Sequence, residues 1–197
     1  MFIKVLLKKY LKNSPGITLV EVIVTVSVIT IFSGIIISDF PKAKRQFALS
    51  AATHKLAQDL RRAQDMSLSG TQLTDYGEEL LLARGFGVYI NLNSASGDNK
   101  RYIIYGDKNN DQEYDPLIDY NLDIVNIDSE LGGVIIKGIY NVSADSVSIN
   151  FYPPNPKTSI SSLEPGASRI KIVLGLESNS TVAREVYVYT SGLIETK

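Results

Sequence analysis

The stretch that decides the fold is SPGITLVEVIVTVSVITIFSGIII, which runs from Ser14 to Ile37. After Pro15 and Gly16 it is almost wholly apolar, yet Glu21 lies near its start. A carboxylate in a lipid-embedded helix costs about 2.5–3.5 kcal/mol on insertion scales. Glu21 therefore requires an explanation that a simple lipid anchor does not supply.

The apolar run is long enough to cross a membrane. From Ile17 to Ser38 the single charged residue is Glu21. A helix of this length rises about 33 Å at 1.5 Å per residue, and a bilayer core is about 30 Å thick. The segment Met1–Asn13 before it is rich in lysine. The positive-inside rule therefore predicts an N-terminus in the cytoplasm and a distal part outside the cytoplasmic membrane.

Three interpretations of this segment remain open. A secretory signal peptide has an apolar region of about 7–15 residues with a small-residue cleavage site after it. Here the apolar run is longer, and the small residue Gly16 comes before it. An uncleaved single-pass anchor carrying an extracellular domain explains the length and the lysines. It does not explain Gly16 or Glu21.

The third interpretation is cleavage between Gly16 and Ile17. The new N-terminus then carries a positive α-amine, and Glu21 lies four residues on, about one helical turn away. A carboxylate in the first turn is stabilised by the positive end of the helix dipole. A buried carboxylate is tolerated when it is paired. If such helices pack in a staggered array, Glu21 of one subunit can meet the amine of its neighbour.

The lysine-rich leader, Gly16 and ITLVEVIVTVSVITI resemble the class III signal of type IV pilins and type II secretion pseudopilins. The resemblance implies that a membrane-embedded prepilin peptidase cuts after Gly16 and N-methylates Ile17, and that Glu21 guides assembly with other subunits. It implies a structural subunit of a type II secretion pseudopilus or, as a minor subunit, of a type IV pilus. The family most often begins with phenylalanine, whereas this chain would begin with Ile17.

A second helical pattern follows Pro41, a residue that kinks or breaks helices. Beyond it, apolar residues recur at steps of three and four and form one stripe: Leu49, Ala52, Leu56, Leu60 and Ala63. Gly70 is a natural stop. The phrase LAQDLRRAQDMS resembles the pseudopilin H group and related minor pilins. The resemblance implies one long helix over residues 17–69, with residues 17–40 apolar and residues 42–69 amphipathic.

The distal part changes to β patterns. Strands are expected at Gly85–Ile90, Arg101–Tyr105, Val134–Ile139, Ser146–Tyr152, Arg169–Leu174, Glu185–Thr190 and Leu193–Ile194. The prolines from Pro153 to Pro156 predict a loop that continues to about Ala167. An antiparallel sheet over residues 85–197 packed on the helix gives an α+β, pilin-like fold. The expected segments are a leader 1–16, an assembly helix 17–40 and a head 41–197.

One acidic loop, GDKNNDQEYD, suggests a cation site. Hard oxygen ligands at steps of two are typical of calcium loops, and they occur here at Asp107, Asn109, Asp111, Glu113 and Asp115. The glycine expected at the sixth position is Gln112, and the twelfth position is Ile118 rather than a bidentate glutamate. A solvated turn and a structural Ca²⁺ site are therefore alternatives, and no other cofactor is expected.

The remaining composition narrows the function classes. The chain has no cysteine, which excludes disulfides, zinc–thiolate sites and thiol nucleophiles. It carries no GxSxG, HExxH or phosphate-binding glycine loop, and the single histidine, His54, fits a structural role. An enzyme is not expected. After the leader the chain has 16 basic and 21 acidic residues, which disfavours a general polyanion binder.

DNA binding at a pilus tip stays an alternative. Such a minor pilin of a DNA-uptake system would need a basic patch on the head. The residues available for one are Lys100, Arg101, Arg169, Lys171 and Arg184.

Overall fold

The computed structural model describes residues 16–71, 73–74, 80–81, 83–93, 98–127, 133–153 and 157–197. The lysine-rich leader, apart from Gly16, lies outside the described residues. The chain forms two compact units, Met1–Ala43 and Lys44–Lys197, and each is described by itself.

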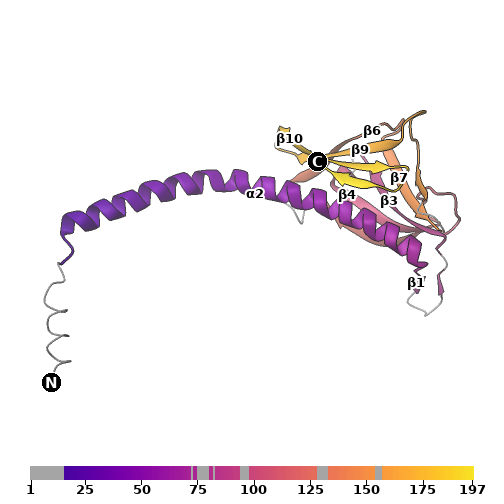
Figure 1. Cartoon of the computed structure of the whole chain (residues 1–197), viewed down its shortest axis with the longest axis horizontal. Helices are drawn as coiled ribbons and strands as arrows, with labels where there is room; N and C mark the ends of the chain where they lie inside the picture. Colours follow the sequence, from indigo (N-terminus) through magenta and orange to yellow (C-terminus); the bar gives the residue numbers. More distant parts are fainter. Residues whose placement is uncertain are drawn as a thin grey trace, which may run out of the picture. The chain divides into compact units, whose positions relative to one another are not determined.

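One helix dominates the N-terminal third of the chain. Helix α2 runs from Leu19 to Ser69 and continues through Pro41 (Figure 1). It ends where Gly70 adopts a φ of 60°, a left-handed conformation that glycine adopts at low cost. The prediction of a single long helix stopping at Gly70 is confirmed. Within the helix, Pro41 removes one backbone hydrogen bond without ending it.

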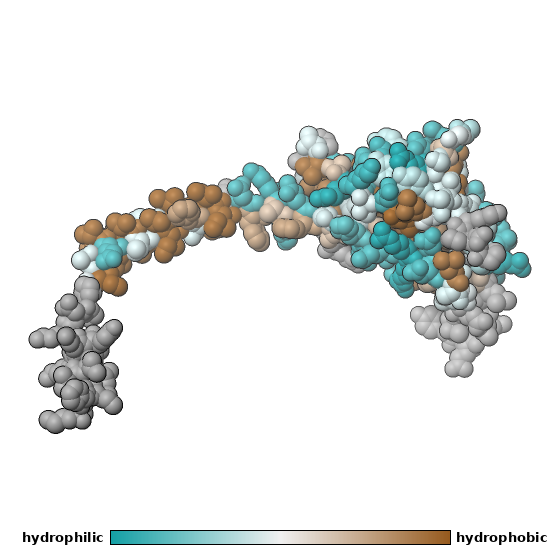
Figure 2. Space-filling view, in the orientation of Figure 1, coloured by the Kyte–Doolittle hydropathy of each residue, from teal (hydrophilic) through white to brown (hydrophobic). Residues whose placement is uncertain are grey.

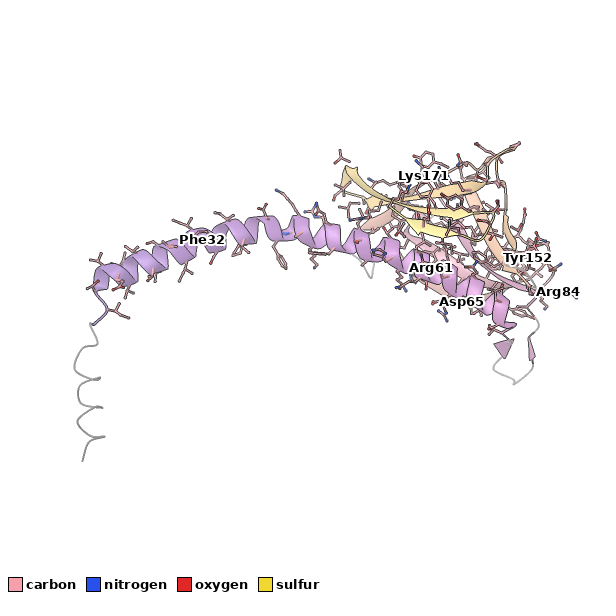
Figure 3. The ribbon with its side chains drawn as sticks, viewed as in Figure 1. Phe32, Arg61, Asp65, Arg84, Tyr152 and Lys171 are labelled. Carbon is pink, nitrogen blue, oxygen red and sulfur yellow. The ribbon has the colours of Figure 1, made fainter. Side chains whose placement is uncertain are left out.

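Within the first unit, the apolar side chains of α2 point outward without covering one another. The large hydrophobic residues between Ile17 and Phe40 are 46–76% exposed. Figure 2 shows that hydrophobic side chains cover most of the visible face of this part of the helix, and Figure 3 labels Phe32 among them. Three hydroxyls on this segment, of Thr25, Ser27 and Thr30, donate to helix carbonyls at 2.7–2.9 Å. Their polar hydrogens are therefore satisfied inside the helix, as an apolar surrounding requires.

In the second unit the same helix buries a stripe. Leu49, Ala52, Leu56, Leu60 and Ala63 are each no more than 2% exposed, so the predicted stripe is confirmed. They belong to one hydrophobic cluster that also contains side chains of the strands. The alanines let the helix backbone approach the sheets closely, while the leucines fill the space between.

All strand pairs between described residues are antiparallel. In the described part of the chain they form a four-stranded sheet of order β11-β10-β9-β6, a five-stranded sheet of order β5-β4-β3-β7-β8 and a β1-β2 pair. The bounds are β1 Leu73–Thr74, β2 Leu80–Leu81, β3 Gly85–Asn91, β4 Arg101–Asp107, β5 Tyr120–Asn126, β6 Val134–Tyr140, β7 Ser146–Tyr152, β8 Lys157–Ile160, β9 Arg169–Leu176, β10 Asn179–Tyr189 and β11 Ile194–Thr196.

The seven expected strands are present, but the sequence suggested one sheet where the structure has two main ones. A short apolar run does not show which other strands it pairs with. The sequence therefore did not predict the division into a sheet with β4-β3-β7 and a sheet with β10-β9-β6. The short pair β1-β2 was missed. Strands β5 and β8 were also missed, and β8 lies inside the segment expected to be a loop. Both are edge strands of the five-stranded sheet. Four of the seven residues of β5 are exposed, and edge strands of this kind lack the apolar alternation that predicts a strand.

Polar contacts hold the helix to both sheets. On the five-stranded side, Ser67 Oγ accepts from Phe86 N at 2.9 Å and donates to Phe151 O. On the four-stranded side, Arg61 donates to Ile194 O and Gln64 donates to Gly192 O, both at 3.2 Å. The helix is thus tied to each sheet by hydrogen bonds as well as by its apolar stripe.

We predict that Leu56→Ala lowers the free energy of unfolding by about 2–5 kcal/mol, because it leaves a cavity in a fully buried position. Chemical denaturation of the full chain in detergent micelles measures this loss. His54→Ala, on the exposed side of the same helix turn, is the control and should change stability by less than about 0.5 kcal/mol. Equal losses in the two variants would contradict the buried stripe.

Candidate functional site

The first functional region is the start of α2. Gly16, Ile17 and Thr18 precede the helix, have no regular secondary structure and are exposed. A Cβ added at Gly16 would meet nothing within 4 Å. The peptide bond between Gly16 and Ile17 therefore lies in an accessible, non-helical segment.

Thr18 caps the helix, a role the sequence reasoning did not assign. Its Oγ1 accepts a hydrogen bond from Glu21 N at 3.2 Å, and its carbonyl accepts from Val22 N at 3.2 Å. A threonine three residues before a glutamate at a helix start is the capping-box pattern, so Thr18-x-x-Glu21 could have revealed it. The cap lies on the distal side of the Gly16–Ile17 bond and stays in the chain if that bond is cut.

Glu21 is exposed in the first turn of the helix. Within the described residues it forms no ion pair, and the nearest acid beyond it on the helix, Asp39, pairs with Lys42 at 3.3 Å. Its carboxylate therefore stands alone on an apolar surface that extends to Phe40.

A second region is the acidic loop, which folds back over the five-stranded sheet. Asp107 is buried and accepts from Asn110 N at 2.5 Å, from Gln112 N at 3.0 Å and from Asn150 Nδ2 at 3.0 Å. Asn110 and Gln112 have φ values of 64° and 69°, which non-glycine residues rarely adopt. The Asp107 carboxylate thus fixes a strained turn.

Asp119 closes the same loop from its other end. Its carboxylate accepts from Lys108 N at 3.0 Å and from Asp115 N at 2.9 Å. Burial raises the pKa of Asp107, while its two backbone hydrogen bonds act in the opposite direction. These two buried carboxylates therefore serve the loop as acceptors for backbone amides.

The five residues expected to be cation ligands differ in burial, and several of them are engaged in hydrogen bonds within the loop. Asp107 is buried, whereas Asn109, Asp111 and Glu113 are exposed. Asp111 accepts from Glu113 N at 2.9 Å, and Asp115 accepts from Leu117 N at 2.9 Å. Among the described residues no group of three or more His, Cys, Asp or Glu side chains is placed to hold a metal ion. The calcium site stays a prediction.

The loop also carries Tyr114 onto the sheet face that points away from the helix. Its ring lies 4.7 Å from the ring of Tyr89 and 5.2 Å from that of Tyr105, measured between centroids. A Cβ at Gly87 would lie 2.7 Å from the Tyr105 ring, so only glycine lets this ring approach β3 so closely. Tyr114 N donates to Ser148 Oγ at 3.0 Å and its hydroxyl donates to Asn121 Oδ1 at 2.8 Å.

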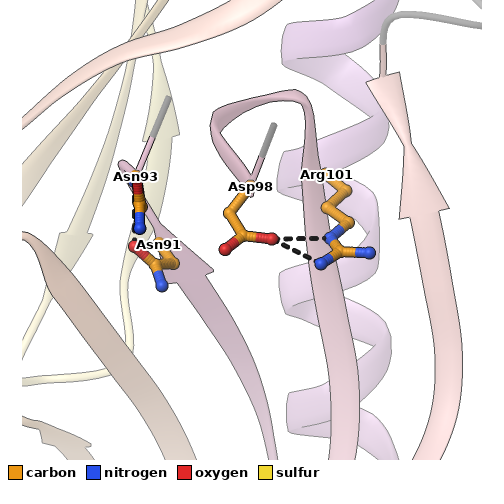
Figure 4. Close-up of polar contacts among 4 residues, drawn as sticks. All are labelled: Asn91, Asn93, Asp98 and Arg101. Atoms are coloured by element: carbon orange, nitrogen blue, oxygen red, sulfur yellow. Dashed lines mark hydrogen bonds and ion pairs between the residues drawn. The ribbon is translucent and has the colours of Figure 1, made fainter. Parts of the chain in front are cut away.

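Beside Tyr114 there is a pocket of about 230 Å³. Its apolar surfaces come from Tyr89 and Ile103, which are paired across β3 and β4, and from Tyr114 and Pro116 of the loop. Its polar end comes from Asn91, Asp98 and Arg101 (Figure 4). The sequence indicated the hairpin but not the return of the loop, so the pocket was not predicted.

The basic residues considered for DNA binding are mostly engaged with acids or aromatic rings. Lys100 pairs with Glu177 at 3.1 Å, Lys171 pairs with Glu185 at 3.5 Å, and Arg101 pairs with Asp98. The Arg169 guanidinium lies over the rings of Tyr187 and Tyr189. Arg184, on β10, is exposed. These contacts do not favour a DNA-binding function, which stays an alternative prediction.

We predict that Tyr105→Phe flattens the alkaline loss of stability. Burial raises the pKa of the Tyr105 hydroxyl far above its usual value of 10.0. Because the folded-state pKa is raised, this group's contribution is complete below pH about 10 and is lost as pH rises beyond it. Denaturation of both proteins between pH about 7 and about 11 measures the difference. Tyr140→Phe, at a 51% exposed position of the other sheet, is the matched control. Identical pH profiles for wild type and Tyr105→Phe would contradict the prediction.

No family model matches the chain, and no curated protein matches it. Among solved structures, the crystal structure of the type IV minor pilin FimU of Pseudomonas aeruginosa strain PAO1 is similar, with a TM-score of 0.46 and 13% sequence identity over 76% of this chain and 92% of that one. A long N-terminal helix followed by antiparallel sheets is the pilin-like arrangement expected from the sequence.

Proposed function

We propose that the chain is a prepilin-like structural subunit. It inserts into the cytoplasmic membrane with its N-terminus inside, is cut between Gly16 and Ile17, is N-methylated on Ile17, and assembles with other subunits into a fibre. The fibre is a type II secretion pseudopilus or a type IV pilus in which the chain is a minor subunit. The observation that carries the proposal is the uncovered apolar surface between Ile17 and Phe40.

That surface requires an apolar surrounding. Exposing one Val- or Ile-sized side chain to water instead of burying it costs roughly 1.5–3 kcal/mol. The helix is long and apolar enough to cross a bilayer, judged by length and composition. A membrane supplies one such surrounding, and the same segments of neighbouring subunits supply another. Transfer from lipid to fibre then changes the solvation of the helix little.

The local structure at the helix start fits processing. A peptidase needs a peptide bond that is accessible and not fixed in a helix, and the Gly16–Ile17 bond meets both requirements. Thr18 caps the helix from the distal side of that bond. Removal of the leader therefore leaves the first turn of the helix with its cap.

Glu21 supports assembly because an unpaired carboxylate in an apolar surrounding costs free energy, and a partner of opposite charge offsets that cost. In the described part of the chain no cation pairs with it, and the surrounding surface is apolar. The α-amine of a processed Ile17 on a neighbouring subunit is a partner of opposite charge. Removing one member of a buried ion pair costs about 3–5 kcal/mol, so such a pair fixes the axial register between subunits.

We predict that Glu21→Ala leaves membrane insertion and cleavage intact and lowers incorporation into fibres at least tenfold, since about 1.4 kcal/mol already corresponds to a factor of ten. The amount of the chain in sheared fibres relative to membranes measures incorporation in the native host.

Asp39→Ala is the matched control, since it removes an exposed acid from the same helix and breaks only its ion pair with Lys42. It should incorporate like the wild type. Normal incorporation of Glu21→Ala would remove the assembly role of Glu21.

A further inference from the structure

The pocket beside Tyr114 has the features of a small-ligand site rather than a packing defect. The pair Tyr89–Ile103 forms one row of the sheet face opposite to that of Tyr102, whose hydroxyl donates to Asp59 on α2. Asn91 follows Tyr89 by two residues on β3, and Arg101 precedes Ile103 by two residues on β4. Both therefore lie on the same face, beside this row. Apolar and polar groups thus follow one another along a single surface.

The apolar part of the pocket is held rigidly. Tyr114 packs against the rings of both Tyr89 and Tyr105, and its backbone is tied to Ser148 on β7. The turn that carries it is fixed by the buried Asp107 and Asp119 carboxylates. Aromatic surface presented in this way binds a ligand without first losing side-chain freedom.

The polar end combines acceptors and donors at no net charge. Arg101 Nε donates to Asp98 Oδ1 at 3.0 Å, and Nη2 donates to the same oxygen (Figure 4). The Arg101 side chain is 45% exposed and that of Asp98 18%, so the guanidinium is the member of the pair that is open to a ligand. Asn91, whose Oδ1 accepts from Asn93 N at 2.9 Å, adds amide donors at the same end.

These features select the chemical class of the ligand. A paired carboxylate and guanidinium cancel in charge, which disfavours phosphates and other strongly charged ligands. Drug-sized ligands occupy pockets of about 300–1,000 Å³, so about 230 Å³ limits the ligand to about one ring. A neutral pyranose has an apolar face of axial C–H bonds and a rim of hydroxyls. The apolar face matches Tyr89 and Tyr114, and the hydroxyls match neighbouring donors and acceptors.

We propose that this pocket binds one neutral hexopyranose unit of a glycan, with the C–H face of the sugar on Tyr89 and Tyr114 and its hydroxyls bonded to Asp98 and Arg101. The site lies wholly within the head and does not depend on the processing or assembly of the N-terminal helix. A glycan-binding head would give the subunit a recognition function in addition to a structural one.

Saturation-transfer NMR on the full chain in detergent micelles tests this proposal. The probes are the methyl β-glycosides of glucose, galactose and N-acetylglucosamine, whose binding is expected with Kd on the order of 1 mM from the efficiency typical of small ligands. At least one glycoside should receive saturation, strongest at its axial ring protons. No saturation of any of the three at about 10 mM, roughly ten times that Kd, would overturn the proposal.

Two variants separate the pocket from unspecific binding to protein or micelle. Arg101→Gln removes the charged donor at an exposed position and should weaken binding about tenfold or more. Lys100→Gln makes the same charge change one residue away, at a side chain paired with Glu177, and should bind like the wild type. Equal saturation in wild type and Arg101→Gln would place the sugar elsewhere and overturn the assignment.

Discussion

The uncovered apolar surface of the first unit is the constraint on which the rest of the structure depends. Between Ile17 and Phe40 the helix presents Val, Ile, Leu and Phe on every side, and it satisfies its own hydroxyls internally. Such a surface is unstable in water. It needs an apolar surrounding, and such a surrounding excludes charge. Glu21 is the exception, and a partner of opposite charge is the simplest physical reason for it.

In the second unit the same helix buries only one side. There it carries a narrow stripe, from Leu49 to Ala63, that completes the core of two antiparallel sheets. A helix that was apolar all round would not leave a polar face for water, and one with only a stripe would not be stable in lipid. The helix changes from an apolar surface to a buried stripe around Pro41. The ion pair between Asp39 and Lys42 lies at the same place. One continuous helix can therefore belong to two environments.

Sequence patterns predicted the helix, its stripe, its end at Gly70 and the central strands, because each depends on local periodicity or on glycine. They did not predict the edge strands β5 and β8 or the division into two sheets, since these depend on which distant strands pair. The acidic loop shows the same limit. Its carboxylates suggested ligands for a cation, but Asp107 accepts from backbone amides and from Asn150, 43 residues away. The pocket formed by Tyr89 and Tyr114 also joins distant segments.

The measurement that tests the central claim most directly is the mass of the intact protein and of its N-terminal peptide, extracted from membranes of cells that contain the native peptidase. The account predicts a chain that begins at Ile17 and carries one added methyl group on its α-amine. A chain that still begins at Met1 would contradict it. The helix would then be a plain membrane anchor, and Glu21 would be a charge in an apolar segment without a partner to offset its cost.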